Sequence, residues 1–122
     1  MRITKLDPEI NHKTFQDGRG GIMTYYPQTD SIKEWNVIFT NKGSVRGKHY
    51  HEEFDEYITI CSGGGVYVGV DDGEEYAVPV SAGDCVYIAK NVPHTFYPRS
   101  DTVMVAQITK KWNDCEKPIT KI

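Results

Sequence analysis

The stretch RGKHYHEEFDE, residues 46–56, decides how this sequence folds, because it carries two of the four histidines one residue apart. On a β-strand alternate side chains share a face, so His49 and His51 project together. Glu56 lies seven positions after His49, an odd offset that would put it on the opposite face of one continuous strand. The polar residues 52–55 predict a turn, after which Glu56 opens the next strand. The three side chains therefore converge only in a β-hairpin.

A second stretch, AGDCVYIAKNVPHTFYP (residues 82–98), predicts a strand and then a turn that ends at His94, directly after Pro93. A loop histidine fixed by a preceding proline is well placed to complete a ligand set. Three imidazoles and one carboxylate suit Fe(II), Mn(II), Zn(II), Ni(II) or Co(II). The alternative is that His49 and His51 face solvent at a barrel mouth and that His94 caps a loop.

The rest of the chain is dominated by strand signals, with short Val-, Ile-, Tyr- and Thr-rich runs between Gly- and Asp-containing turns. This pattern favours a β-sandwich or barrel. A short helical turn is expected only at Ser31–Trp35, and a tight turn at Gly63–Gly65. The tail, residues 110–122, is expected to lie extended across the body of the protein or across a neighbouring subunit. The expected strands are Ile22–Tyr26, Lys33–Thr40, Ser44–Tyr50, Tyr57–Cys61, Val66–Val70, Tyr76–Val80, Asp84–Ile88 and Val103–Thr109.

Length and composition predict one globular domain. The chain has 122 residues, of which 39% are hydrophobic and 25% charged, and its net charge is −3. This charge offers no broad basic field, which argues against a nucleic-acid partner. No apolar run reaches membrane-spanning length, and the N-terminus does not read as a signal peptide. Three cysteines without CxxC spacing predict reduced thiols and a cytoplasmic location.

These motifs resemble those of the cupins, small β-barrel proteins. The first cupin motif is filled without a gap by Gly43, His49, His51, Glu56 and Gly63. The second resembles residues 83–94, but it has Ala89-Lys90-Asn91 where many members have Pro-x-Gly, and Pro98 stands where a trailing Asn is usual. Asn can adopt the left-handed conformation that Gly supplies, so the turn is expected to survive.

The resemblance implies an all-β fold, a single cupin (jelly-roll) double-stranded β-barrel over residues 1–122. N-terminal strands would occupy residues 1–42, the barrel core 43–98, and a C-terminal strand and tail 99–122. It also implies a homodimer, since a small barrel with exposed strands has edges to cover.

A narrower resemblance rests on DGRGGIMTYYP and WNVIFTNKGSVRGKHYH. They are similar to segments of cupins that act on nucleotide-linked deoxysugars: 3,5-epimerases, 3,4-ketoisomerases and the metal-binding cupin domain of capsular-sugar reductases. The resemblance implies that Arg19 and Arg46 contact phosphate or sugar oxygens through their bidentate guanidinium groups. Arg19 is equally consistent with an exposed loop residue that contacts no substrate. The side chain of Arg46 turns toward the barrel mouth only if the strand is broken at Gly47.

In metal-free members of that group the histidine corresponding to His49 is a general base, whereas Glu56 favours metal ligation here, so we rank ligation first. The leading hypothesis is an isomerase or epimerase of a nucleotide-linked keto-deoxysugar. A divalent transition metal (Zn, Fe, Mn or Ni) would polarise the keto group, and an enediolate would form. Tyr25, Lys48 and Tyr97 are candidates for proton handling. The alternatives are a non-haem iron dioxygenase of a small molecule and a non-catalytic sugar- or small-ligand-binding cupin.

Overall fold

The computed structural model describes residues 1–8, 15–26 and 28–122, and most of the regular structure in them is β-strand. Among these residues no helix is long and apolar enough to cross a membrane. The strands are β1 (Thr4–Leu6), β2 (Phe15–Asp17), β3 (Gly20–Ile22), β4 (Glu34–Thr40), β5 (Arg46–Tyr50), β6 (Glu56–Ser62), β7 (Gly64–Asp71), β8 (Glu74–Ser81), β9 (Cys85–Ile88), β10 (His94–Pro98), β11 (Thr102–Ile108) and β12 (Thr120–Lys121), with one turn of 3-10 helix, η1 (Trp112–Asp114).

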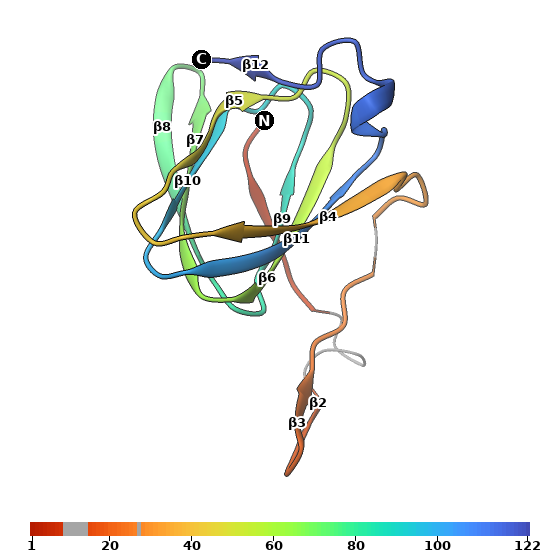
Figure 1. Ribbon diagram of the computed structural model, residues 1–122, viewed down its shortest axis with the longest axis vertical. Helices are drawn as coiled ribbons and strands as arrows, with labels where there is room; N and C mark the ends of the chain where they lie inside the picture. The colour runs from red at the N-terminus through yellow and green to blue at the C-terminus, as the bar shows by residue number, and fades with distance from the viewer. Residues whose placement is uncertain (9–14, 27) are drawn as a thin grey trace.

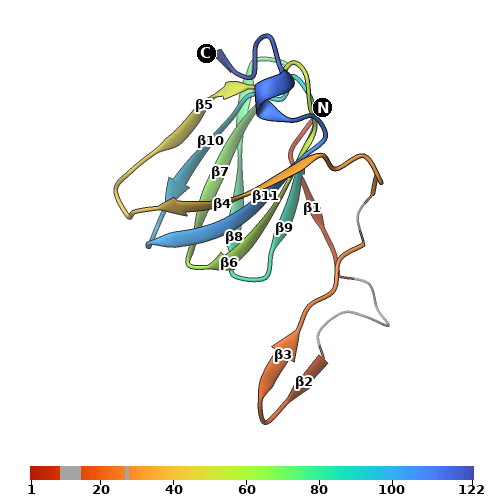
Figure 2. The ribbon, with the colours of Figure 1, turned by 45° about the vertical axis from the view of Figure 1, so that its right-hand side comes forward.

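Two antiparallel five-stranded sheets form the body of the molecule. One has the strand order β1-β9-β6-β11-β4 and the other β12-β5-β10-β7-β8, so most neighbours in space are distant in sequence. Figures 1 and 2 show the two sheets wrapped around a shared interior. This arrangement confirms the expected all-β jelly-roll barrel.

The core lies between the sheets and follows from the two-residue period of each strand. On β6, Ile58 and Ile60 are nearly inaccessible to solvent, and each pairs across the sheet with a buried residue of β11, Ala106 and Met104. Tyr67 and Phe96 enter the same core from the opposite sheet. Burying one such aliphatic side chain stabilises the fold by roughly 1.5–3 kcal/mol.

The expected helical turn at Ser31–Trp35 is wrong, because β4 begins at Glu34 and pairs with β11 along its whole length. The alternation of exposed Trp35, Val37 and Phe39 with intervening residues has the period of a strand, and pairing with β11 outweighs the local helical propensity. The expected strand at Ile22–Tyr26 is also wrong: β3 ends at Ile22, and the described residues 23–26 and 28–33 form no strand.

Strands β1, β2, β10 and β12 were not anticipated from the sequence, and β3 shares only Ile22 with an expected strand. His94 does not lie in a loop but opens β10, which pairs with both β5 and β7. Near the N-terminus, β1 adds to the edge of β9. The tight turn expected at Gly63–Gly65 is shorter than predicted: β6 ends at Ser62 and β7 begins at Gly64, so only Gly63 lies between the two strands.

Two peripheral features flank the barrel. The hairpin of β2 and β3 projects away from it, as Figure 1 shows, and the residues of β3 are exposed. The C-terminal tail crosses the body of its own chain: η1 lies beside the barrel mouth, and β12 pairs with β5 through Thr120 opposite Tyr50 and Lys121 opposite His49. The tail thus adds a strand to the element that carries the histidine pair.

Candidate metal centre

The expected β-hairpin is wrong, because β5 and β6 do not pair and lie in different sheets. The loop between them crosses from one sheet to the other and still brings the two motif histidines over Glu56. This loop is held from several sides. Phe54 is buried and stacks on the His51 ring with 4.4 Å between centroids. Asp55 accepts a hydrogen bond from the Lys90 backbone N–H, and Glu53 binds the tail through Lys110. Residues 52–55 therefore form the expected turn, and contacts with other parts of the chain anchor it.

A β-bulge in β5 turns Arg46 toward the cavity. The register with β10 shifts between His94 and Thr95, so that Lys48 is the extra residue. Gly47 has φ +108° and Lys48 φ +58°, both in the region that favours glycine. Without the bulge Arg46 would share a face with Lys48; with it, Arg46 and His49 both line the cavity. The break at Gly47 that the sequence suggested is confirmed.

The second motif delivers His94 from the opposite strand. Asn91 has φ +65°, which confirms that it replaces the usual glycine of this turn. Its backbone N–H donates to the His51 carbonyl over 2.8 Å, which ties the two histidine-bearing segments together. Val92 then supplies a carbonyl to the His94 ring, and β10 begins.

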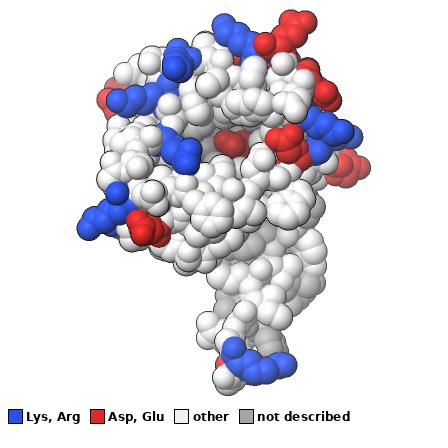
Figure 3. All heavy atoms as spheres, in the orientation of Figure 1, with Lys and Arg blue, Asp and Glu red and all other residues white. Residues whose placement is uncertain are grey.

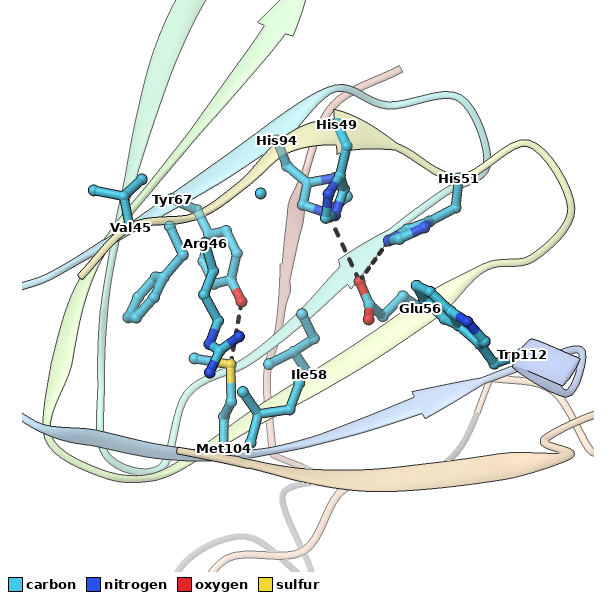
Figure 4. Close-up of a pocket in the computed structure, with 13 residues that line it drawn as sticks. Val45, Arg46, His49, His51, Glu56, Ile58, Tyr67, His94, Met104 and Trp112 are labelled. Carbon is cyan, nitrogen blue, oxygen red and sulfur yellow. Dashed lines mark hydrogen bonds and ion pairs between the residues drawn. The ribbon is translucent and has the colours of Figure 1, made fainter. Parts of the chain in front are cut away.

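Three histidines and one carboxylate meet inside the barrel mouth (Figure 4). One nitrogen from each of His49, His51 and His94 can be chosen so that all three lie within 4.8 Å of one another. The Oε1 atom of Glu56 lies 3.5 Å from Nε2 of His51 and 3.9 Å from Nε2 of His94. His51, His94 and Glu56 are buried, and His49 is half-buried.

Backbone carbonyls orient two of the rings. Nδ1 of His51 lies 2.9 Å from the carbonyl oxygen of Pro118, and Nδ1 of His94 lies 2.9 Å from that of Val92. A carbonyl can only accept, so each neutral ring carries its proton on Nδ1 and turns the lone pair of Nε2 toward the cluster. Metal-binding histidines in proteins are oriented in this way.

Burial and the charges of their neighbours shift the pKa values of all four groups. Burial, together with the charges of His94 and His51, lowers the pKa of His49 to about 4. Burial also lowers the pKa of His94. For His51 burial acts in the same direction, but hydrogen bonding to Glu56 and the charge of that carboxylate raise its pKa overall. Burial acts to raise the pKa of Glu56, yet the histidines around it lower it.

The cluster forms one wall of a cavity of about 400 Å³. Figure 3 shows its open mouth with an acidic side chain at the base, and Glu56 is the acidic residue among those lining it. Arg46 lies on the other side of the mouth, where its Nε and Nη2 atoms each donate over 2.8 Å, to Thr40 Oγ1 and the Phe39 carbonyl. Apolar side chains complete the walls: Ile38, Val45, Ile58, Phe96, Met104 and Trp112.

The other residues singled out from the sequence lie elsewhere. The hydroxyl of Tyr25 donates to the Gly83 carbonyl, and Lys48 and Tyr97 are exposed and do not line the cavity. The structure thus gives no support to any of these three as a proton-handling group. Arg19 lies at the tip of the β2–β3 hairpin, exposed and paired with Asp17 at 2.6 Å, away from the cavity of its own chain.

Sequence reasoning missed three contributors to the site: Tyr67, Trp112 and the Pro118 carbonyl. Tyr67 could have been found from the alternation along β7, which turns it inward between Val66 and Val68. The tail contacts carry no local sequence signal, because they depend on where the C-terminal segment crosses the barrel.

Comparison with known proteins identifies the family of this chain. The family model described as "Cupin domain" matches residues 36–108, more than half of the chain. The chain is a cupin. No curated protein was found to match its sequence.

Among solved structures, this cupin is similar to the QdtA 3,4-ketoisomerase from Thermoanaerobacterium thermosaccharolyticum, solved in complex with TDP. The identity is 17%, over 98% of this chain and 87% of the other, with a TM-score of 0.81. A 3,4-ketoisomerase from Helicobacter canadensis is 16% identical over 100% of this chain and 92% of the other, with a TM-score of 0.82. The 3'-monoepimerase ChmJ from Streptomyces bikiniensis, solved with dTDP-quinovose, is 20% identical over 98% of this chain and 69% of the other, with a TM-score of 0.83. At these identities the likeness shows the fold.

The residues of this cupin fit a divalent transition metal. Imidazole nitrogens and one carboxylate are the donor set that Fe, Mn, Ni and Zn accept. Two of the rings present Nε2 because their Nδ1 atoms are engaged, and the buried Glu56 carboxylate has only histidines as ion-pair partners among the described residues. A buried carboxylate needs a compensating charge, and a bound cation would supply it.

Proposed function

We propose that this cupin is a metal-dependent isomerase or epimerase of a nucleotide-linked keto-deoxysugar. The observation that carries the proposal is the convergence of His49, His51, His94 and Glu56 beside Arg46 at the mouth of one cavity. The fold shared with sugar-nucleotide ketoisomerases and epimerases supports the substrate class.

In this proposal the four clustered side chains are the metal ligands. A divalent metal, when bound, supplies a Lewis acid that polarises a carbonyl group and lowers the pKa of the adjacent C–H bond. The apolar walls exclude water from the reacting carbons, which strengthens every electrostatic interaction within the cavity.

Arg46 is the proposed anchor for the substrate. Two of its guanidinium nitrogens are held by Thr40 and Phe39, while Nη1 has no protein acceptor among the described residues. A guanidinium fixed in this way loses little side-chain entropy when it binds a phosphate or sugar oxygen. Arg19 stands too far from the cavity of its own chain to take part there, so any contact it makes with substrate would have to be in another subunit.

Solvent exchange tests the proposed reaction directly. Protein loaded in turn with Fe(II), Mn(II), Ni(II) or Zn(II) is incubated in heavy water with TDP-4-keto-6-deoxyglucose and related 4-keto-6-deoxy sugars. Proton NMR should show deuterium entering the carbon next to the keto group, and metal-free protein should show none. Absence of exchange across the panel, or oxygen uptake by the iron form in its place, would contradict the proposal and favour the dioxygenase alternative.

We also propose that the protein is a homodimer. β4 is the last strand of its sheet, and its outward side chains Trp35, Val37 and Phe39 are 65%, 47% and 66% exposed. Large apolar side chains on an edge strand mark an association surface. Light scattering should give a dimer mass that Val37→Glu reduces to that of a monomer, whereas Ala77→Glu, on exposed β8, should not. A monomeric wild type would contradict this.

We also propose a cytoplasmic location, which the three free cysteines support.

A further inference from the structure

The hydroxyl group of Tyr67 is buried against a poor hydrogen-bond acceptor. The residue is only 3% exposed, and its Oη atom lies 3.4 Å from the Sδ atom of Met104. A thioether accepts weakly, so most of the donor capacity of the phenol is unused. Buried polar groups are normally paired well, and an exception calls for an explanation.

Packing alone does not explain the hydroxyl. The Tyr67 ring stacks at a tilt on Phe96, with 4.9 Å between centroids, inside the apolar core. A phenylalanine would make the same ring contacts without the cost of burying a hydroxyl group. Figure 4 shows the hydroxyl directed toward the Met104 sulfur, and both residues line the cavity that also holds Glu56.

The proposed function leaves few groups that could assist the reaction. Six of the described residues lining the cavity carry ionisable side chains: Arg46, His49, His51, Glu56, Tyr67 and His94. If the three histidines and Glu56 bind the metal, and Arg46 anchors the substrate, only Tyr67 remains. Burial raises the pKa of Tyr67 well above its ordinary value, and the charge of Glu56 adds to this. The phenol therefore keeps its proton at neutral pH and acts as a donor.

We propose that Tyr67 donates a hydrogen bond to the substrate oxygen on which negative charge develops as the sugar enolises. This inference rests on the proposed function. The hydroxyl would exchange its weak contact with Met104 for a strong one with a charged oxygen, and the phenol would keep its proton throughout. A fixed donor in a water-poor cavity stabilises developing charge at little cost in reorganisation. Tyr67 is then a catalytic residue in addition to the metal ligands.

The first test compares Tyr67→Phe with Tyr57→Phe, a control on the outer face of the other sheet, where Tyr57 packs on Tyr87. Both variants should keep the wild-type metal content and affinity for TDP, and neither should melt below the wild type. Tyr67→Phe should lower the rate of deuterium exchange into saturating TDP-4-keto-6-deoxyglucose by about 10²- to 10³-fold, with little change in KM. Exchange within a factor of two of the control would overturn the proposal.

A second test does not require turnover and so separates this inference from the proposed function. Hydroxyacetone labelled with ¹³C at its carbonyl is titrated into the wild type and into Tyr67→Phe, and the infrared carbonyl stretch is recorded. We expect a saturable shift to lower frequency in the wild type that Tyr67→Phe reduces, because the hydrogen bond from the phenol adds to any polarisation by the metal. Equal spectra for the two proteins, or no saturable shift in the wild type, would overturn the role of Tyr67 even if the sugar reaction were confirmed.

Discussion

The carbonyl oxygen of Pro118 lies 2.9 Å from Nδ1 of His51, so a residue near the end of the chain orients a ring near its middle. The tail that carries Pro118 is held by Glu53, which accepts from Lys110 Nζ at 2.9 Å and from the Lys117 backbone N–H at 2.7 Å. Ile122 adds a backbone hydrogen bond to the carbonyl of Lys48. The C-terminal segment is thus part of the support of the proposed metal centre.

Replacing Glu53 by Ala should therefore weaken metal binding without removing a ligand. Loss of both contacts to the tail frees the Pro118 carbonyl, and loss of such an orienting partner lowers metal affinity by about 10- to 100-fold. Competition with a chromophoric chelator measures the Kd. Glu52→Ala is the matched control, because Glu52 makes only a 3.9 Å contact with Lys117. Equal Kd values for the two variants would contradict a supporting role for the tail.

Glu56→Gln tests the carboxylate of the ligand set. The substitution keeps the shape but removes the charge, so the affinity for a divalent metal should fall by about a hundredfold or more. In the metal-free protein the pKa of His51 should also fall, because hydrogen bonding to Glu56 and its charge are what raise it against the effect of burial. NMR titration of the imidazole signals measures this pKa. A His51 pKa that does not move would show that Glu56 is turned away from the ring.

Proton competition gives the metal affinity a defined pH dependence. Only neutral imidazoles bind metal. The pKa of His49 is about 4 and that of His94 is lowered, so both rings stay available in mildly acidic solution. His51, whose pKa is raised above 6.5, is protonated first as the pH falls.

Metal affinity should thus be nearly constant above the pKa of His51 and fall by about tenfold per pH unit below it, since one proton is displaced. Measuring Kd between pH 5 and pH 8 checks this, and Glu56→Gln should move the onset to lower pH. An affinity that stays flat down to pH 5 would contradict the assignment of His51 as a ligand.

Gly47→Ala should destabilise both the barrel and the site. At φ +108° a Cβ atom on this residue would lie 2.6 Å from the His94 carbonyl oxygen, so strained backbone and a clash coincide. We expect a loss of about 2 kcal/mol or more in the free energy of unfolding, measured by denaturant titration. Gly18→Ala, whose Cβ would meet nothing within 4 Å, should change stability little. Similar stabilities for both variants would show that the bulge is not required.

The convergence of the two histidines on Glu56 could be predicted because it depends on local rules, but the hairpin expected to produce it does not form, since β5 and β6 lie in different sheets. The two-residue period of a strand fixes His49 and His51 on one face, and a turn is needed to bring Glu56 back. The bulge that turns Arg46 inward was foreseeable as well, since Gly47 interrupts the strand, and Asn91 took the left-handed conformation expected of it.

The features that could not be predicted from the sequence depend on pairing between segments that are far apart in the chain. Strand β10 reads as a loop because Pro93 precedes it, yet it pairs with strands far away in the chain on both sides. The helical turn expected at Ser31–Trp35 failed for a similar reason, since β11 pairs with that segment from about 70 residues away. The contact between Pro118 and His51 has no local signature at all.

Metal analysis tests the central claim most directly. Protein stripped with chelator, then exposed in turn to Mn(II), Fe(II), Ni(II) and Zn(II) and desalted, is analysed by mass spectrometry, and the bound ion is examined by X-ray absorption. We expect about one divalent ion per chain with three imidazoles in its coordination shell, and loss of that ion in the double variant His49→Ala, His94→Ala. A folded wild type that retains none of these ions, or an ion that stays bound in the double variant, would contradict it.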